Sequence, residues 1–298
     1  MRLIANNNSE SFTLNSHDKQ LIELAFAEDL GSPYCDLTTR CLFPDADFFV
    51  EANIISKHHE PIILCGLPVV EYALSVLDLR CKLQSSFHDG DVVMPGQILL
   101  SISGPSSILM AERTLLNFLQ RLCAVATLTS KFVGCIQHTN AKILDTRKTM
   151  PGFRHLDKYA VVCGGGVNHR MGLYDAIMIK DTHVDALGGM DFAIHALPVS
   201  DHPVIVEVRS VSELNAVMEF GLSKITRVLL DNMSCDLIRQ CVDICDGRLP
   251  LESSGNVDLD NVLEIAECGV DFISVGKLTH SAGNANLSMT CSDAVLER

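Results

Sequence analysis

The sequence has no tryptophan and only four tyrosines among its 298 residues. It also has fewer basic than acidic residues, 23 against 37, which gives a formal net charge of −14 and a pI of about 5.1. Binding to a nucleic-acid backbone needs a basic face, and binding to single strands also needs aromatic platforms on which bases stack. The composition therefore argues against a nucleic-acid partner.

Long hydrophobic runs are lacking as well. No apolar run approaches the roughly 20 residues that are needed to cross a bilayer, and residues 1–8 contain no apolar signal core. Cysteine is plentiful, with twelve residues, but disulfide frameworks are typical of small secreted domains. Cys241 and Cys245 lack the second ligand pair of a zinc site, so we interpret them as packing residues of a helix. We expect a cytoplasmic protein with reduced thiols and no membrane partner.

The first part of the chain has the pattern of a small domain of helices and antiparallel strands. Residues 16–29 have apolar positions at helical spacing after a candidate N-cap at Asn15 or Ser16. Short β-rich runs then alternate with turn dipeptides. The expected helices are 16–29 and 67–79, and the expected strands are 48–55, 61–65, 82–87, 91–93 and 97–103. Residues 107–134 return to a helical period and predict one or two long helices.

After residue 140 the pattern changes to short β-rich runs that are separated by helical segments. The runs recur about every 20 to 35 residues, a spacing typical of βα units that form a parallel sheet or barrel. The six runs are 142–145, 176–179, 204–208, 227–230, 249–251 and 272–275.

Polar and charged residues follow all six runs. In a parallel α/β barrel the carboxyl ends of the strands share one mouth, where functional sites are built. A single polar residue there could simply mark where a buried strand reaches solvent, but six such ends favour a site. The residues that end the runs are Asp145-Thr146-Arg147, Lys180-Asp181, Glu207-Val208-Arg209, Asp231-Asn232, Glu252-Ser253-Ser254-Gly255 and Gly276-Lys277.

Cations are concentrated in one stretch beside this expected mouth. Residues 147–180 hold six Lys or Arg residues and only two acids, Asp157 and Asp175. Arg can hold an oxyanion with a bidentate fork and Lys acts as a point charge, so the stretch is suited to carboxylates or phosphates. The candidate ligand-binding residues are Arg147, Lys148, His169, Arg170 and Lys180.

Two acids, Glu207 and Asp231, are expected in the same mouth, and Mg²⁺ prefers a few carboxylate oxygens together with substrate phosphate. Gly255 and Gly276 each follow a strand and could let backbone N–H groups approach a further phosphate. A ligand that pairs a Mg²⁺-bound pyrophosphate with a separate carboxylate would use both the acids and the cations. Phosphoribosyl pyrophosphate carries both a Mg²⁺-binding pyrophosphate and a separate phosphate for the glycine loops.

In these motifs the chain resembles the family of nicotinate-nucleotide pyrophosphorylases (carboxylating), also called quinolinate phosphoribosyltransferases. The resemblance covers nearly the whole chain, and the combination of motifs is highly specific. It is carried by residues 28–31, 36–39, 111–117, 146–154, 164–170, 179–181, 206–208, 230–232, 252–255 and 271–276.

The resemblance implies an α/β fold with two domains. An N-terminal α+β sandwich domain is expected at 1–116, and the C-terminal tail of about 279–298 is expected to join it. A TIM-like but incomplete α/β barrel of parallel strands is expected at 117–278. The resemblance also implies a homodimer, or a higher oligomer, whose active sites are shared between subunits.

The resemblance assigns roles residue by residue. The carboxylates of quinolinate are expected to lie among Arg147, His169, Arg170 and Lys180, with Arg113 donated by the partner subunit. Phosphoribosyl pyrophosphate is expected to bind Lys148, Glu207, Asp231, Ser254, Gly255 and Gly276. The expected catalytic residues are Lys180, Glu207 and Asp231, and the expected ligands of Mg²⁺, directly or through water, are Glu207 and Asp231.

The chain departs from the family pattern in three places. The family's Ser-Gly-Ile-Ala-Thr is Cys-Ala-Val-Ala-Thr at 123–127, and its Lys-Asp-Asn-His is Lys-Asp-Thr-His at 180–183. In the phosphate loop, Ala-Ser-Gly-Gly is replaced by Ser-Ser-Gly-Asn at 253–256. Asn256 restricts the backbone there unless it adopts the left-handed conformation, which Asn tolerates better than most residues.

The implied reaction transfers the phosphoribosyl group of phosphoribosyl pyrophosphate to quinolinate with decarboxylation. It gives nicotinate mononucleotide, pyrophosphate and CO₂ in de novo NAD biosynthesis. Catalysis would consist chiefly of positioning and charge stabilisation, with no covalent nucleophile. We expect Lys180 or His169 to assist the decarboxylation.

Three alternatives stay open from the sequence alone. A related phosphoribosyltransferase could use the same cations for another aromatic carboxylate base. Lys180 on a barrel strand could instead form a Schiff base, which requires a dry pocket. A non-enzymatic anion-binding protein would need the cations, but not the two acids together with an arginine from the partner subunit.

Overall fold

The computed structural model describes residues 12–42 and 48–291. Residues 1–11 of the expected N-terminal domain and residues 292–298 of the expected C-terminal tail lie outside the described residues, as do residues 43–47. The chain divides into two compact units. The first holds 12–42, 48–128, 150–165 and 282–291 of the described residues, and the second holds 129–149 and 166–281.

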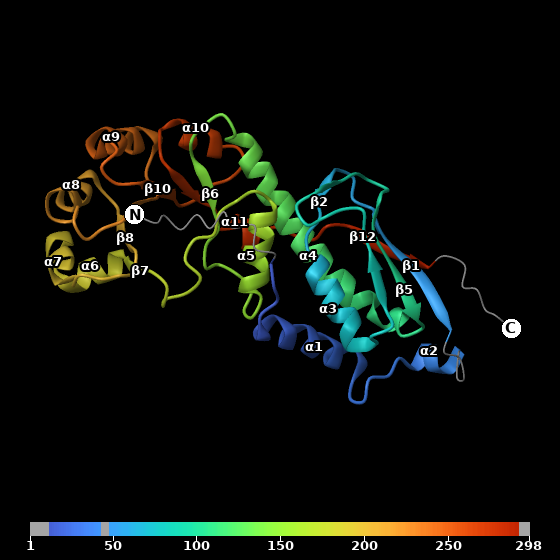
Figure 1. The fold of residues 1–298 in the computed structure, drawn as a ribbon. Helices are drawn as coiled ribbons and strands as arrows, with labels where there is room; N and C mark the ends of the chain where they lie inside the picture. Colours follow the sequence, from blue (N-terminus) through green and yellow to red (C-terminus); the bar gives the residue numbers. More distant parts are fainter. Residues whose placement is uncertain (1–11, 43–47, 292–298) are drawn as a thin grey trace. The chain divides into compact units, whose positions relative to one another are not determined.

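The first unit is built on antiparallel strands (Figure 1). Its four-stranded sheet has the order β12-β1-β5-β3, and β2 pairs separately with β4. The strands are β1 (Phe49–Ser56), β2 (Ile62–Ile63), β3 (Lys82–Gln84), β4 (Val92–Val93), β5 (Ile98–Pro105) and β12 (Leu287–Cys291). The helices that begin in this unit are α1 (Ser16–Leu30), α2 (Leu37–Leu42), α3 (Leu67–Leu77), α4 (Ile108–Cys135) and α5 (Arg154–Cys163).

The local signals in this part of the sequence produce the expected elements. Asn15 caps α1: its side chain accepts from the N–H groups of His17 and Asp18, and Asp18 accepts from the N–H of Asn15. The helical stretch at 107–134 forms the single helix α4. The predicted domain boundary between 116 and 117 lies inside α4, and the two predicted domains stay a prediction.

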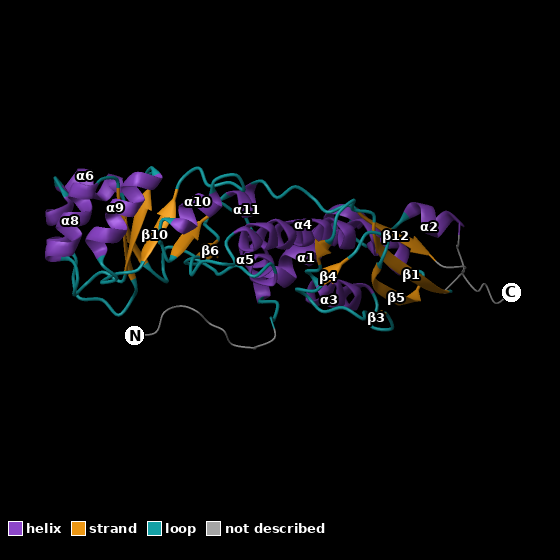
Figure 2. Ribbon diagram, turned by 90° about the horizontal axis from the view of Figure 1, so that it is seen from above, coloured by secondary structure: helices purple, strands orange, loops and turns teal. Residues whose placement is uncertain are grey.

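The second unit contains six parallel strands in the order β6-β11-β10-β9-β8-β7. Figure 1 shows helices alternating with these strands, and Figure 2 shows the strands beside α6, α8, α9 and α10. The strands are β6 (Lys142–Leu144), β7 (Ile177–Ile179), β8 (Val204–Val208), β9 (Arg227–Asp231), β10 (Leu251–Ser254) and β11 (Phe272–Ser274). The helices are α6 (Asp181–Leu187), α7 (Met190–Ala196), α8 (Val211–Phe220), α9 (Cys235–Cys245), α10 (Val262–Glu267) and α11 (Lys277–His280). This arrangement confirms the predicted fold class of an incomplete α/β barrel with an added α+β part.

One predicted strand is misplaced. The run expected at 249–251 is β10 at Leu251–Ser254. Pro250 has no N–H to donate to a neighbouring strand, although its carbonyl accepts from the N–H of Val228. The strand therefore starts after Pro250, and Glu252 lies inside it rather than at its end.

All twelve cysteines are free thiols, and Cys241 and Cys245 are buried on α9 as predicted. In the described parts of the chain, no helix is both long and apolar enough to cross a membrane.

Candidate active site

Three neighbouring strands of the second unit carry charged groups at their carboxyl ends. Lys180 follows β7, and its Nζ lies 3.8 Å from Oε2 of Glu207 on β8. Burial raises the pKa of the Glu207 carboxyl, Lys180 lowers it, and Asp231 and Asp181 raise it again. Lys180, Glu207 and Asp231 are thus close enough for their charges to act on one another, as predicted.

The loop after β10 packs on the loop after β9. Ser254 is paired in register with Asp231, and the N–H of Asn232 donates to the Ser254 carbonyl at 2.7 Å. Gly255 has a φ of +103°, and a Cβ there would lie 3.0 Å from Cα, Cβ and Oδ1 of Asn232. Because both the conformation and the space exclude a side chain, the position requires glycine.

Asn256, the main departure from the family pattern, adopts the left-handed conformation with a φ of 50°. Its Nδ2 donates to Oδ1 of Asn232 at 3.0 Å, and its carbonyl accepts from Nδ2 of Asn261 at 3.0 Å. The residue therefore meets the backbone requirement identified from the sequence. Its side chain also links the loop after β10 to the loop after β9.

Gly276 and Lys148 lie against each other beside β11. A Cβ on Gly276 would lie 3.1 Å from Cδ of Lys148 and 3.2 Å from the ring of His280. The hydroxyl of Thr279 donates to the carbonyl of Lys148 at 2.7 Å. The main chain of Lys148 is thus fixed to the segment after β11, and its exposed side chain lies against Gly276, which the sequence predicts to bind phosphate.

Arg170 is a buried cation with a fixed guanidinium. The side chain donates from Nη1 to the carbonyl of Ala176 at 3.0 Å, and Nη2 lies 3.6 Å from the sulfur of Met178. Burial lowers the pKa of Arg170, and Arg147 lowers it further, against an opposing effect of Asp175. The second unit therefore brings two mutually repelling arginines together, and a bound anion would relieve that repulsion.

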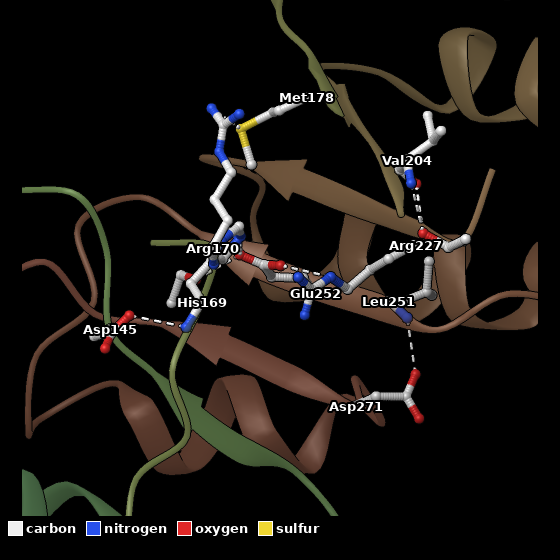
Figure 3. A network of polar contacts seen from close by, with 11 residues as sticks. Asp145, His169, Arg170, Met178, Val204, Arg227, Leu251, Glu252 and Asp271 are labelled. Atoms are coloured by element: carbon white, nitrogen blue, oxygen red, sulfur yellow. Dashed lines mark hydrogen bonds and ion pairs between the residues drawn. The ribbon is translucent and has the colours of Figure 1, made fainter. Parts of the chain in front are cut away.

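His169 precedes Arg170 and contacts protein groups through both ring nitrogens. Its Nδ1 accepts from the N–H of Arg170 at 2.6 Å, and its Nε2 lies 3.4 Å from Oε1 of Glu252. The His169 N–H donates to Oδ1 of the buried Asp145 at 2.8 Å. In Figure 3, Glu252 lies between His169 and Arg227, whose Nε is 3.1 Å from Oε2. Sequence reasoning gave Glu252 no role, and the only available signal was an acid within a motif of the family.

Arg113 belongs to the first unit, unlike the other predicted site residues. It lies on α4 with 60% of its side chain exposed, and its Nη2 is 3.7 Å from Oε1 of Glu112. Its expected contribution to a partner's active site stays a prediction.

A second group of metal-ligating side chains lies in the first unit, formed by Cys65, Asp89 and Cys163. Asp89 already accepts from the N–H groups of Gly66 and Leu67, where α3 begins, and from the Tyr159 hydroxyl at 2.6 Å. Burial raises the pKa of the Cys65 thiol well above its usual value. Helix capping and thiol packing account for these contacts.

Comparisons with known proteins place most of the chain in one family. The family described as Quinolinate phosphoribosyl transferase, C-terminal domain, matches residues 125–290, and its N-terminal domain matches residues 36–123. The chain is 38% identical over 290 residues to quinolinate phosphoribosyltransferase (decarboxylating) 1b of Nicotiana tabacum, covering 91% of this chain and 81% of that protein. It is 36% identical over 275 residues to the probable nicotinate-nucleotide pyrophosphorylase (carboxylating) of Bacillus subtilis, covering 91% and 92%.

A solved structure has the same fold. The nicotinate-nucleotide pyrophosphorylase from Francisella tularensis superposes with a TM-score of 0.88 at 37% identity, covering 96% of this chain and 100% of that one. Both domains, the motifs and the fold therefore agree, and the chain belongs to the quinolinate phosphoribosyl transferase family.

Proposed function

We propose that this chain transfers the phosphoribosyl group of phosphoribosyl pyrophosphate to quinolinate with decarboxylation, forming nicotinate mononucleotide, pyrophosphate and CO₂ in de novo NAD biosynthesis. It is thus a pentosyltransferase. One observation carries the proposal. The second unit contains two arginines that repel each other, Arg147 and Arg170, and two carboxylates that repel each other, Glu207 and Asp231. Membership of the family supports the choice of substrates.

The arginines suit the dicarboxylate. Arg170 is held by the carbonyl of Ala176, and burial and Arg147 both disfavour its charge while Asp175 favours it. Arg147 is exposed and close enough to repel it. A molecule with two adjacent carboxylates, such as quinolinate, would satisfy both guanidiniums through charge-assisted hydrogen bonds. Lys180 offers a third cation, and Arg113 of a partner subunit is proposed as a fourth.

The acids and glycine loops suit phosphoribosyl pyrophosphate. Glu207 and Asp231 fit a divalent cation, because their mutual repulsion is the kind that a metal removes. Bound Mg²⁺ would neutralise charge on the departing pyrophosphate. The 5′-phosphate is expected at Ser254, Gly255 and Gly276, because the two glycines have no side chain that would keep a phosphate away from the main chain.

The proposed chemistry needs positioning rather than a protein nucleophile. The quinolinate nitrogen uses its lone pair to form a bond to C1 of the ribose. At the same time the bond from C1 to the pyrophosphate oxygen breaks, and the electron pair of that bond leaves with pyrophosphate. The bond from C2 of the pyridinium to its carboxylate then breaks and releases CO₂. The electron pair stays on C2, next to the positive nitrogen, until a proton is added.

Lys180 is the better placed of the two residues that we expected to assist the decarboxylation. Its ammonium is partly exposed, whereas both ring nitrogens of His169 face protein groups. A Lys180→Ala variant with unchanged turnover would argue against this role. The exposed, ion-paired environment of Lys180 also disfavours the alternative of a Schiff-base enzyme, which requires a dry pocket.

Assembly and location complete the proposal. We infer a homodimer with shared active sites, on the basis of the predicted use of Arg113 by the partner subunit. We also infer that the protein is cytoplasmic, on the basis of its composition. Mixing a variant of Arg113→Ala with an inactive variant of Glu207→Gln tests the shared site, because only a mixed dimer would contain one intact site. Recovery of activity on mixing is the expected result, and no recovery despite subunit exchange argues against shared sites.

The decisive assay combines purified protein, quinolinate, phosphoribosyl pyrophosphate and Mg²⁺, and follows nicotinate mononucleotide and CO₂ together. Equal amounts of both products are expected. Neither product from folded protein would redirect the assignment to a transferase for another aromatic carboxylate base. Omitting Mg²⁺ or adding a chelator tests the metal requirement.

A further inference from the structure

Glu252 is a charged residue in the middle of a buried strand. Its side chain is 0% exposed, and its neighbours Leu251 and Ser253 on β10 are buried as well. An ionised carboxylate is costly to bury unless its oxygens are paired. An apolar residue would suit this place in the sheet better, so the carboxylate requires an explanation.

All the polar groups that the structure places around this carboxylate can donate a proton to it. The Ser274 hydroxyl on β11 donates to Oε1, Nε2 of His169 lies 3.4 Å from Oε1, and Nε of Arg227 lies 3.1 Å from Oε2 (Figure 3). Burial would raise the pKa of Glu252, but His169, Arg227 and Ser274 together hold it below its ordinary value. Glu252 is therefore an anion whose two oxygens act only as acceptors.

The second nitrogen of the His169 ring determines where the ring proton lies. The main-chain N–H of Arg170 can only donate, and it lies 2.6 Å from Nδ1 of His169. Nδ1 therefore carries no proton, and the ring proton is on Nε2, the nitrogen that faces Glu252. A continuous path of contacts thus runs from Glu252 through the ring to the main chain of Arg170.

We propose that Glu252 is a positioning residue for the anion site: it holds His169 as the Nε2–H tautomer, and His169 in turn holds the main chain of Arg170. The proposal rests on the proposed function, in which Arg170 binds a quinolinate carboxylate. Asp145, which accepts from the His169 N–H, provides a second anchor for the same segment. The competing explanation is that Glu252 serves only as a counter-charge for Arg227.

Two double variants separate these explanations. E252Q/R227Q and E252M/R227Q both remove the ion pair, and neither leaves a buried charge without its partner. In E252Q/R227Q the new amide oxygen at position 252 can still accept from His169, while the amide NH₂ can donate to the new side chain at 227. In E252M/R227Q a side chain of similar length offers His169 no oxygen. The two proteins therefore differ mainly in this one acceptor.

Steady-state kinetics give the first readout. We expect the KM for quinolinate to be roughly 3-fold higher in E252M/R227Q than in E252Q/R227Q, because the lost contact between Nε2 and Oε1 is 3.4 Å long and weaker than a well-formed hydrogen bond. The KM for phosphoribosyl pyrophosphate should differ little between them. Equal KM values for quinolinate in the two variants would overturn the proposal and leave only the structural ion pair.

Imidazole ¹⁵N spectra of the substrate-free protein give the second readout. His169 is assigned by difference from H169N, and we expect the Nε2–H tautomer in the native chain and in E252Q/R227Q. In E252M/R227Q the ring has no acceptor at position 252 and can turn away from the N–H of Arg170, so we expect a mixture of tautomers. This measurement involves no turnover, so an error in the substrate assignment would leave the tautomer difference intact. An unchanged tautomer in E252M/R227Q would overturn the inference whatever the activity.

Discussion

Replacing Lys180 with Met is expected to shift the acid limb of the pH profile to higher pH. Burial, Asp231 and Asp181 all raise the pKa of Glu207, and Lys180 is the charge that opposes them. Without Lys180 the carboxyl becomes harder to ionise. Activity that requires ionised Glu207 is lost as the pH falls through the pKa of Glu207. If that pKa is higher, the loss begins at a higher pH.

The structure sets the size of this shift. Nζ of Lys180 lies 3.8 Å from Oε2 of Glu207, and the two side chains are 46% and 11% exposed. Two unit charges about 4 Å apart interact by about 4 kcal/mol at an effective dielectric constant of about 20, and by about 1 kcal/mol in water. Because the lysine is nearly half exposed, screening brings the value toward the lower limit. We expect about 1–2 kcal/mol, or roughly one pH unit.

The assay is kcat/KM for phosphoribosyl pyrophosphate from about pH 5 to pH 9 at fixed Mg²⁺, which reports ionisations of the free enzyme. Lys180→Arg retains the charge and should leave the limb in place. Lys148→Met removes a cation that lies against Gly276 and should lower the rate without moving the limb. An acid limb that stays in place in Lys180→Met, or moves to lower pH, would refute the reasoning.

Three further predictions follow from the site. Nicotinate lacks the 2-carboxylate and would leave a desolvated cation such as Arg170 unpaired, at about 3–5 kcal/mol, so kcat/KM should favour quinolinate by roughly two to three orders of magnitude; equal values contradict this. Gly255→Ala should raise the KM for phosphoribosyl pyrophosphate at least about tenfold through backbone strain. The control Gly247→Ala, at a φ of +67° in open space, should leave that KM unchanged. Similar KM values in both variants would argue against phosphate binding by the loop at Gly255. Because the pKa of Glu252 lies below its usual 4.5, its stabilisation is present above that pH and lost as the pH falls through the lowered pKa. Denaturant titrations from about pH 5 to pH 3 should therefore show a smaller loss of unfolding free energy in E252Q/R227Q than in the native chain, and an equal loss would contradict it.

The strands of the second unit could be predicted because their signal is local. Each β-rich run is bounded by polar residues, and the barrel geometry then implies that Lys180, Glu207 and Asp231 share one edge. The left-handed backbone at Asn256 could also be anticipated, because the residue type and its place in the loop restrict the choices.

Glu252 could not be recognised in the same way. It follows Pro250 and precedes two serines, so in the sequence it resembles a polar residue at a strand end. Its burial depends on Arg227 and His169, which come from distant positions in the chain. The use of Arg113 is harder still to predict from local sequence, because it depends on the association of two chains.

The position of β12 has a consequence for synthesis of the protein on the ribosome. Residues 287–291 form the strand that pairs with β1, and β1 lies between β12 and β5 in the sheet. The parallel sheet is complete once β11 has emerged, whereas the antiparallel sheet, whose first strands are made earlier, must wait for β12 at 287–291. Until then one side of β1 is an open edge, with unpaired N–H and C=O groups able to pair with another nascent chain. A chain that stops before residue 287 would keep that edge exposed, so truncation before β12 should cause aggregation rather than a simple loss of activity.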